Sequence, residues 1–196
     1  MGFFASLRMT YRAFEGLSDS LIGGICKQSM KPFESIEEEL RRRDPGWWDR
    51  IVHNIPELDT LAGTPQPERY HAEGDVAEHT KLAIEACPPD CDPDLLWAAL
   101  LHDVGKPLVT KDEDDNITAH GHQAVGAEIA ERILELLQME PTRRERIVWA
   151  IPHHTFHLSW NLTAPEQASQ RHRRFVADQR FPLLLELLRV DSAASL

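Results

Sequence analysis

The sequence of 196 residues has little cysteine, no long apolar run and no excess of basic residues. Its three cysteines, Cys26, Cys87 and Cys91, are too few and too scattered for a disulfide framework, so we expect reduced thiols in a cytoplasmic protein. Cys87 and Cys91 flank two prolines, but no second cysteine pair follows, which disfavours a zinc site there. No apolar stretch reaches the roughly 20 residues of a membrane span, and we expect no signal peptide, because residues 1–7 have no basic segment ahead of a long apolar run.

The formal net charge is −11, and no patch of Lys and Arg dominates the sequence. We therefore expect no stable complex with nucleic acid, whose phosphates require basic partners. A small phosphorylated substrate remains compatible with this charge if a metal ion supplies positive charge locally. Acidic and basic residues balance over residues 1–45, and Gly23-Gly24 indicates irregular structure there. We predict an N-terminal extension over residues 1–45 and one domain over residues 46–196.

The remaining sequence predicts an all-α fold, because no run alternates with period two for long enough to make a strand. Capping boxes predict helices that begin at Asp75, Thr142 and Thr163. Asp92 and Pro93 predict the start of an apolar helix over 93–103, which Gly105 and Pro107 are expected to end. Periodicity predicts further helices at 34–43, 47–53, 121–137 and from 182 onward, with loops at 54–74 and 111–116.

A histidine and an aspartate, His102 and Asp103, stand together at the last turn of the apolar helix. Such a pair is costly to bury unless its members are paired or hold a metal. Adjacent residues point about 100° apart on a helix and rarely bond to each other, so a metal ion bridges them better than direct contact. Alone, the dipeptide is equally consistent with a structural hydrogen-bonded pair.

Other residues that can bind metals lie near the end or on the apolar face of most later helices: His79, His120, His122, His153, His154 and Asp191. Histidine and carboxylate together suit Mn, Fe, Co, Ni and Zn, and in a helical bundle they converge on one central site. A lone histidine is more often a helix cap or a surface residue. We apply that interpretation to His53, His157 and His172 and leave His71 undecided.

The order of these residues resembles that of the HD-domain metal-dependent phosphohydrolases. Several stretches resemble more closely the HD domain attached to tRNA CCA-adding nucleotidyltransferases: Gln66 with 70–80, 98–107, 121–127, 173–175 and 187–194. The resemblance covers about residues 56–196, and it implies an all-α HD-domain helical bundle with a metal site between the central helices. The motif of the nucleotidyltransferase head is absent, so no CCA-adding activity is implied.

The resemblance also assigns roles to individual residues. Four positions match the ligands of a first metal: His79, His102, Asp103 and Asp191. Three match or adjoin the ligands of a second metal: His122, His153 and His154. Whether His120 or His122 is the ligand stays open. Lys106 matches a position near the substrate phosphate, where its ammonium group can neutralise a phosphoryl oxygen.

The implied cofactor is one or two divalent ions, drawn from Mn, Ni, Fe, Co, Mg and Zn. A water whose pKa the metal lowers would attack phosphorus, with Asp103, Lys106 and His102 as the catalytic residues. The implied substrate is a phosphomonoester or cyclic phosphodiester of a nucleotide or a similar molecule. Two alternatives are an HD-type diiron oxygenase, which uses the same ligands, and a nucleotide-binding sensor without catalysis, for which a broken ligand set would be expected.

Overall fold

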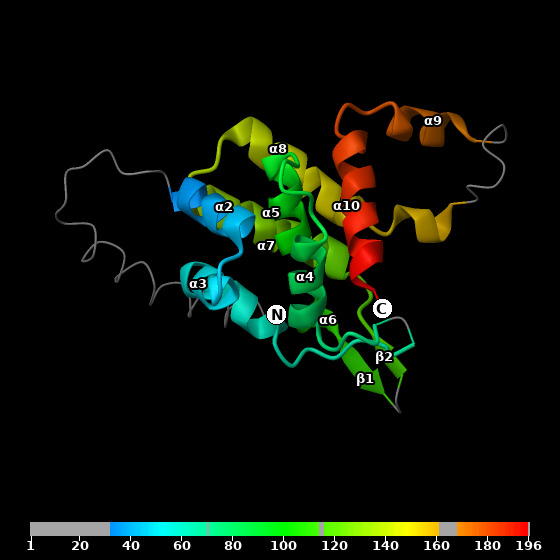
Figure 1. Cartoon of the computed structure of the whole chain (residues 1–196). Helices are drawn as coiled ribbons and strands as arrows, with labels where there is room; N and C mark the ends of the chain where they lie inside the picture. Colours follow the sequence, from blue (N-terminus) through cyan, green and yellow to red (C-terminus); the bar gives the residue numbers. More distant parts are fainter. Residues whose placement is uncertain (1–31, 70, 114–115, 161–167, 196) are drawn as a thin grey trace, which may run out of the picture. The chain divides into compact units, whose positions relative to one another are not determined.

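Helix α5, Pro93–Leu101, is the central helix around which the others pack (Figure 1). In the computed structural model, which describes residues 32–69, 71–113, 116–160 and 168–195, every residue of α5 from Asp94 onward is buried. Its neighbours are α2 (Pro32–Arg42), α4 (Val76–Glu85), α8 (Pro141–Ala150) and α10 (Phe181–Ala194). A helix that is apolar on all sides must be enclosed, so the predicted all-α bundle is confirmed.

The first described helices belong to the same core. Helix α2 buries Phe33, Ile36 and Leu40, and it is followed by α3 (Trp47–Asn54) and the 3₁₀ helix η1 (Pro56–Leu61). The compact unit begins at residue 31, so α2, which we placed in the N-terminal extension, packs within the bundle. Its amphipathic spacing supplies the reason, because one face is apolar and needs a partner.

Two of the predicted helix starts are confirmed. The Asp75 carboxylate accepts a hydrogen bond from the Glu78 amide at 2.9 Å and caps α4. The Asp92 carboxylate accepts one from the Asp94 amide at 2.9 Å and caps α5. These bonds satisfy amide groups that have no partner inside the helix.

A third predicted start is wrong, and a fourth lies outside the described residues. Helix α8 begins at Pro141 rather than after Thr142, with Glu140 at the N-cap position and no side-chain cap, because the fixed φ of proline suits the first helical position. Thr163 is not described. The described helix α9, Gln170–Val176, is capped instead by the Ser169 hydroxyl.

The turn that follows α5 packs directly against α7, His122–Leu136. Gly105 has φ −82° and ψ −16°, so it is not a left-handed helix cap, and the chain continues into the short helix α6, Lys106–Val109. A Cβ atom at position 105 would lie 2.2 Å from the carbonyl oxygen of His122 and 2.5 Å from the amide nitrogen of Gly126. The absence of a side chain therefore allows the close approach of the turn to α7.

A short hairpin interrupts the helical chain where we predicted a polar loop. Strand β1, Lys111–Glu113, pairs antiparallel with β2, Asn116–Thr118. All of β1 is exposed, so it has no buried face to produce an apolar–polar alternation in the sequence. After α8 the chain forms two 3₁₀ helices, η2 (Ile151–His153) and η3 (Phe156–Ser159).

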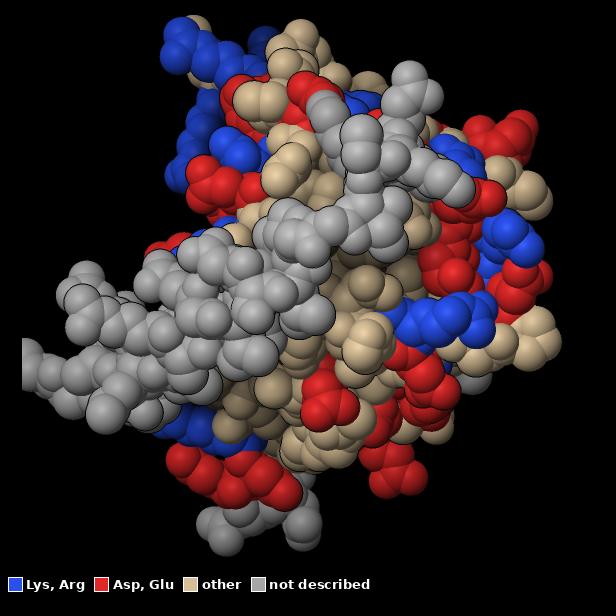
Figure 2. Space-filling view, turned by 90° about the vertical axis from the view of Figure 1, so that its left-hand side faces the viewer, with Lys and Arg blue, Asp and Glu red and all other residues tan. Residues whose placement is uncertain are grey.

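The charges of the described surface are mixed on the face that Figure 2 shows. Lys and Arg side chains lie among Asp and Glu side chains there. Among the described residues, Arg42 forms ion pairs with Glu38 at 3.6 Å and with Asp44 at 2.9 Å. None of the described helices has both the length and the apolar character needed to cross a membrane.

Candidate metal centre

The bundle brings six of the predicted ligand residues together at the end of α5: His79, His102, Asp103, His122, His154 and Asp191. They come from α4, from the turn after α5, from the start of α7, from the residue after η2 and from α10. Five of the six are buried, and the side chain of Asp191 is 20% exposed. Segments far apart in the sequence therefore converge on one buried polar cluster.

The first group of ligand atoms belongs to His79, His102 and Asp191, which lie within 4.8 Å of one another. The Nε2 atom of His79 is 2.9 Å from Oδ1 of Asp191, and the Nε2 atom of His102 is 3.7 Å from the same oxygen. The Oδ2 atom of Asp103 is 3.2 Å from His102 Nε2. Two imidazoles and two carboxylates thus face one small volume.

The second group consists of Asp103, His122 and His154. The Oδ1 atom of Asp103 is 3.3 Å from Nε2 of His122 and 3.7 Å from Nε2 of His154. Because Oδ2 of the same carboxylate faces the first group, Asp103 lies between the two groups. This arrangement can hold two cations that share one carboxylate.

Each of the four histidines turns Nε2 inward because its Nδ1 atom is anchored outside. Three anchors are backbone carbonyl oxygens: Ala99 for His102 at 2.8 Å, Ala119 for His122 at 2.7 Å and Ile151 for His154 at 2.6 Å. A carbonyl oxygen only accepts hydrogen bonds, so Nδ1 carries the proton and Nε2 keeps its lone pair. Metal-ligating histidines are oriented in this way.

The electrostatics of the cluster also suit a cation. His102 Nε2 and Asp103 Oδ1 are buried and have no hydrogen-bond partner among the described residues. Burial lowers the pKa of His154 to about 4 and also lowers that of His122, so both rings are neutral at pH 7. Burial opposes a charge on His102, but the carboxylates of Asp103 and Asp191 raise its pKa to about 9. The centre therefore favours positive charge.

Both carboxylates of the cluster stay ionised. Burial by itself would raise the pKa of Asp103, but His102 and Lys106 hold it well below its usual value. Burial also opposes ionisation of Asp191, whose pKa is lowered to about 2 by the hydrogen bond from His79 and by His102. Divalent metals bind neutral imidazoles and ionised carboxylates, and a bound ion would displace the extra proton from His102, so the residues present fit such an ion.

Lys106 lies at the edge of this cluster. Its Nζ atom is 2.7 Å from Asp103 Oδ2 and donates a hydrogen bond of 2.6 Å to the side-chain oxygen of Gln66. Gln66 is buried and comes from the loop before α4. Sequence analysis assigned no role to Gln66, although it was part of the stretch that carried the family resemblance.

The structure places His153 away from the cluster, unlike its neighbour His154. The Nδ1 atom of His153 donates to the carbonyl oxygen of Trp149 at 2.6 Å, and its ring lies against the rings of Trp149 and Phe175. Of the other pair of candidates, His120 is exposed, whereas His122 joins the second group.

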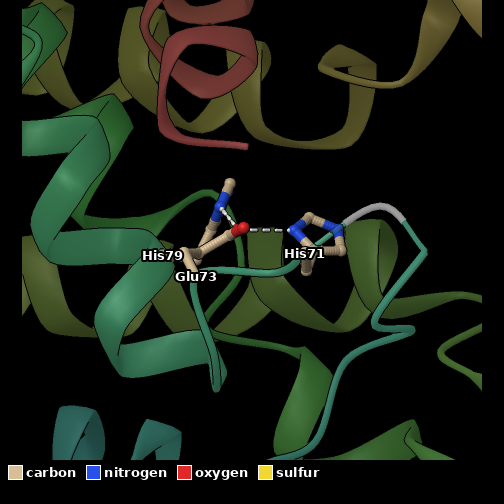
Figure 3. Close-up of side chains that lie close together, drawn as sticks. All are labelled: His71, Glu73 and His79. Carbon is tan, nitrogen blue, oxygen red and sulfur yellow. Dashed lines mark hydrogen bonds and ion pairs between the residues drawn. The ribbon is translucent and has the colours of Figure 1, made fainter. Parts of the chain in front are cut away.

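The one histidine anchor that is a side chain is Glu73, which sequence analysis missed. Its Oε1 atom accepts hydrogen bonds from Nδ1 of His79 at 2.7 Å and from Nδ1 of His71 at 2.8 Å (Figure 3). These two bonds give His71, left undecided from the sequence, a place next to the centre. The signal was the same stretch of family resemblance, which includes both residues.

A helical bundle with buried histidine and carboxylate groups of this kind defines a candidate metalloprotein. The family model of the HD domain matches residues 74–187, which is more than half of the chain. The chain therefore belongs to the HD-domain family, which is part of the metal-dependent phosphohydrolase superfamily.

Similar proteins include the multifunctional CCA proteins of Teredinibacter turnerae and Alkalilimnicola ehrlichii. The first is 37% identical over 112 residues, which are 56% of this chain and 27% of that protein. The second is 41% identical over 89 residues, which are 45% of this chain and 21% of that protein. The similarity thus spans about a quarter of the length of these relatives.

Proposed function

We propose that this chain is a metal-dependent phosphohydrolase that hydrolyses a phosphomonoester or a cyclic phosphodiester of a nucleotide or nucleotide-like molecule. The observation that carries the proposal is the pair of ligand groups on either side of Asp103, with the ammonium group of Lys106 2.7 Å from the same carboxylate. This combination offers metal ligands and a cation for an anionic substrate in one place. The nucleotide class follows from the family resemblance.

In this proposal the two groups of residues would each hold a divalent ion. His79, His102 and Asp191 would ligate the first ion, and His122 and His154 the second. Asp103 would contribute one oxygen to each side. When bound, such ions lower the pKa of a coordinated water and polarise phosphoryl oxygens.

The residues of the chain would then act mainly by position and charge. The backbone anchors hold the histidine rings so that no reorganisation is needed when substrate binds. Lys106, held by Gln66, would present its ammonium group to a non-bridging phosphoryl oxygen and stabilise the charge that develops there. A small phosphorylated substrate, rather than a stable nucleic-acid complex, is the partner that we propose.

A metal-resolved phosphatase screen tests the proposal. The purified protein is stripped of metal, reloaded with Mn, Ni, Co, Mg, Zn or Fe in turn, and assayed against nucleotides, 2′,3′-cyclic nucleotides and a chromogenic diester. We expect hydrolysis that depends on the metal and that proceeds equally well without oxygen. Turnover only with iron and oxygen would favour the oxygenase. Nucleotide binding without hydrolysis under every metal would favour the sensor.

A further inference from the structure

The anchor of His79 differs in kind from the anchors of the other three inward-facing histidines. His102, His122 and His154 donate to backbone carbonyls within their own helix or turn. His79 donates instead to the carboxylate of Glu73 at 2.7 Å. A carboxylate carries a full negative charge and belongs to a side chain, so its contribution can be removed by mutation, unlike that of a carbonyl.

Glu73 is held in place by the structure around it. Its side chain is 1% exposed, and it accepts a second hydrogen bond from His71 through the same oxygen, as Figure 3 shows. The following residue, Gly74, has φ +126°, which lets the chain turn so that Glu73 reaches the first turn of α4. The Asp75 cap and its bond from the Gly63 amide at 2.7 Å fasten this loop.

We infer that Glu73 is a positioning residue for the metal centre, which fixes the ring of His79 with Nε2 directed at the first ion and strengthens that nitrogen as a ligand. The inference rests on the proposed function, because it assigns His79 to that ion. A carboxylate that accepts the outer N–H of a ligating histidine raises the basicity of the ring and holds its orientation. His71 would stabilise the ionised form of Glu73 by the second bond.

The test is the affinity of the protein for Zn²⁺, which can be measured without a substrate. Zn²⁺ is also diamagnetic. Calorimetric titration of metal-free protein with Zn²⁺ compares wild type with Glu73→Ala, Glu73→Gln and His71→Ala. We expect Glu73→Ala to weaken the tighter binding step by roughly 10- to 100-fold, the usual effect of losing such a partner. Glu73→Gln should lose less, because an amide oxygen still accepts the hydrogen bond. His71→Ala keeps the hydrogen bond between Glu73 and His79, so its zinc affinity should fall less than that of Glu73→Ala.

Glu78→Gln is the matched control. It removes a carboxylate five residues from Glu73, but that carboxylate is exposed and pairs with Lys81 on the same helix. Its zinc affinity should stay within about twofold of wild type, because surface ion pairs contribute little. Circular dichroism and thermal melting without metal would show whether each variant folds. If Glu73→Ala does not fold, Glu73→Gln replaces it in the comparison of zinc affinities.

A second readout follows the bond directly. In ¹⁵N-histidine spectra of the folded protein, the Nδ1 proton of His79 should be protected and shifted downfield, and Glu73→Ala should abolish that signal. An unchanged zinc affinity, or an unchanged Nδ1 signal, in folded Glu73→Ala would overturn the inference. Wild type that binds zinc but hydrolyses no phosphate ester would refute the proposed function alone. Folded wild type that binds no zinc would also overturn the inference, because Glu73 would then position no metal ligand.

Discussion

Replacing Gly105 by alanine should damage both the fold and the metal centre. Gly105 adopts an ordinary right-handed conformation, so alanine is allowed by its backbone angles. The obstacle is space, since the new Cβ would lie 2.2 Å from the His122 carbonyl oxygen and 2.9 Å from Gly126 Cα. These are backbone atoms of α7, which cannot move aside as a flexible side chain can. The turn and α7 must therefore separate.

The size of the effect follows from this geometry. Overpacking of a core costs about 1–3 kcal/mol when side chains can adjust, so a clash with backbone should cost about 3 kcal/mol or more. In a domain of this size each kcal/mol lowers the melting temperature by roughly 2–4 °C, which gives a fall of about 6–12 °C. Because His122 is part of the displaced backbone, the second ligand group should open and metal content should fall.

Gly126→Ala is the control from the opposite side of the same contact. Its Cβ would lie 3.3 Å from the Gly105 nitrogen, a tight contact that a small shift relieves, and alanine favours the helix. Differential scanning calorimetry and plasma mass spectrometry on the same samples compare both variants with wild type. If Gly105→Ala melts within about 2 °C of wild type and keeps its metal, close packing is not the reason for glycine here.

Four further predictions concern the centre and the domain. Asp103→Asn should abolish turnover and reduce metal content, because Asp103 faces both ligand groups. His122→Ala should keep the first ion and lose less activity. Equal metal loss in the two variants, measured by mass spectrometry, would show a single shared site. Lys106→Ala should lower kcat by about 10²–10³ with metal content unchanged, and steady-state kinetics with a normal kcat would exclude the phosphate role of Lys106. Saturation with Mn, Ni or Zn should stabilise the protein by about 3 kcal/mol at a hundredfold excess over Kd, and a melting curve that does not move would argue against the centre. Deletion of residues 1–30 should leave hydrolysis within about fivefold of the intact protein, since the compact unit begins at residue 31; loss of activity in a folded truncation would show that the domain extends further.

Local patterns in the sequence were sufficient for several features of this protein. The unbroken apolar run over 95–101 required an enclosed helix, and Asp75 and Asp92 marked the helix starts that the structure contains. These features depend on neighbours within a few residues, where periodicity and capping act. The histidines and carboxylates of the cluster were candidates for a similar reason, because their residue types are metal ligands wherever they stand.

Tertiary packing decided which candidates meet. His153 and His154 are adjacent, yet the first lies against Trp149 and Phe175 and the second faces Asp103. Neighbours on a helical turn point in different directions, so the phase of the helix against the bundle selects one of them. The close contact of Gly105 with α7 likewise arises only when separate segments pack together. The physical cause in both cases is the position of another segment in space, which local sequence patterns do not encode.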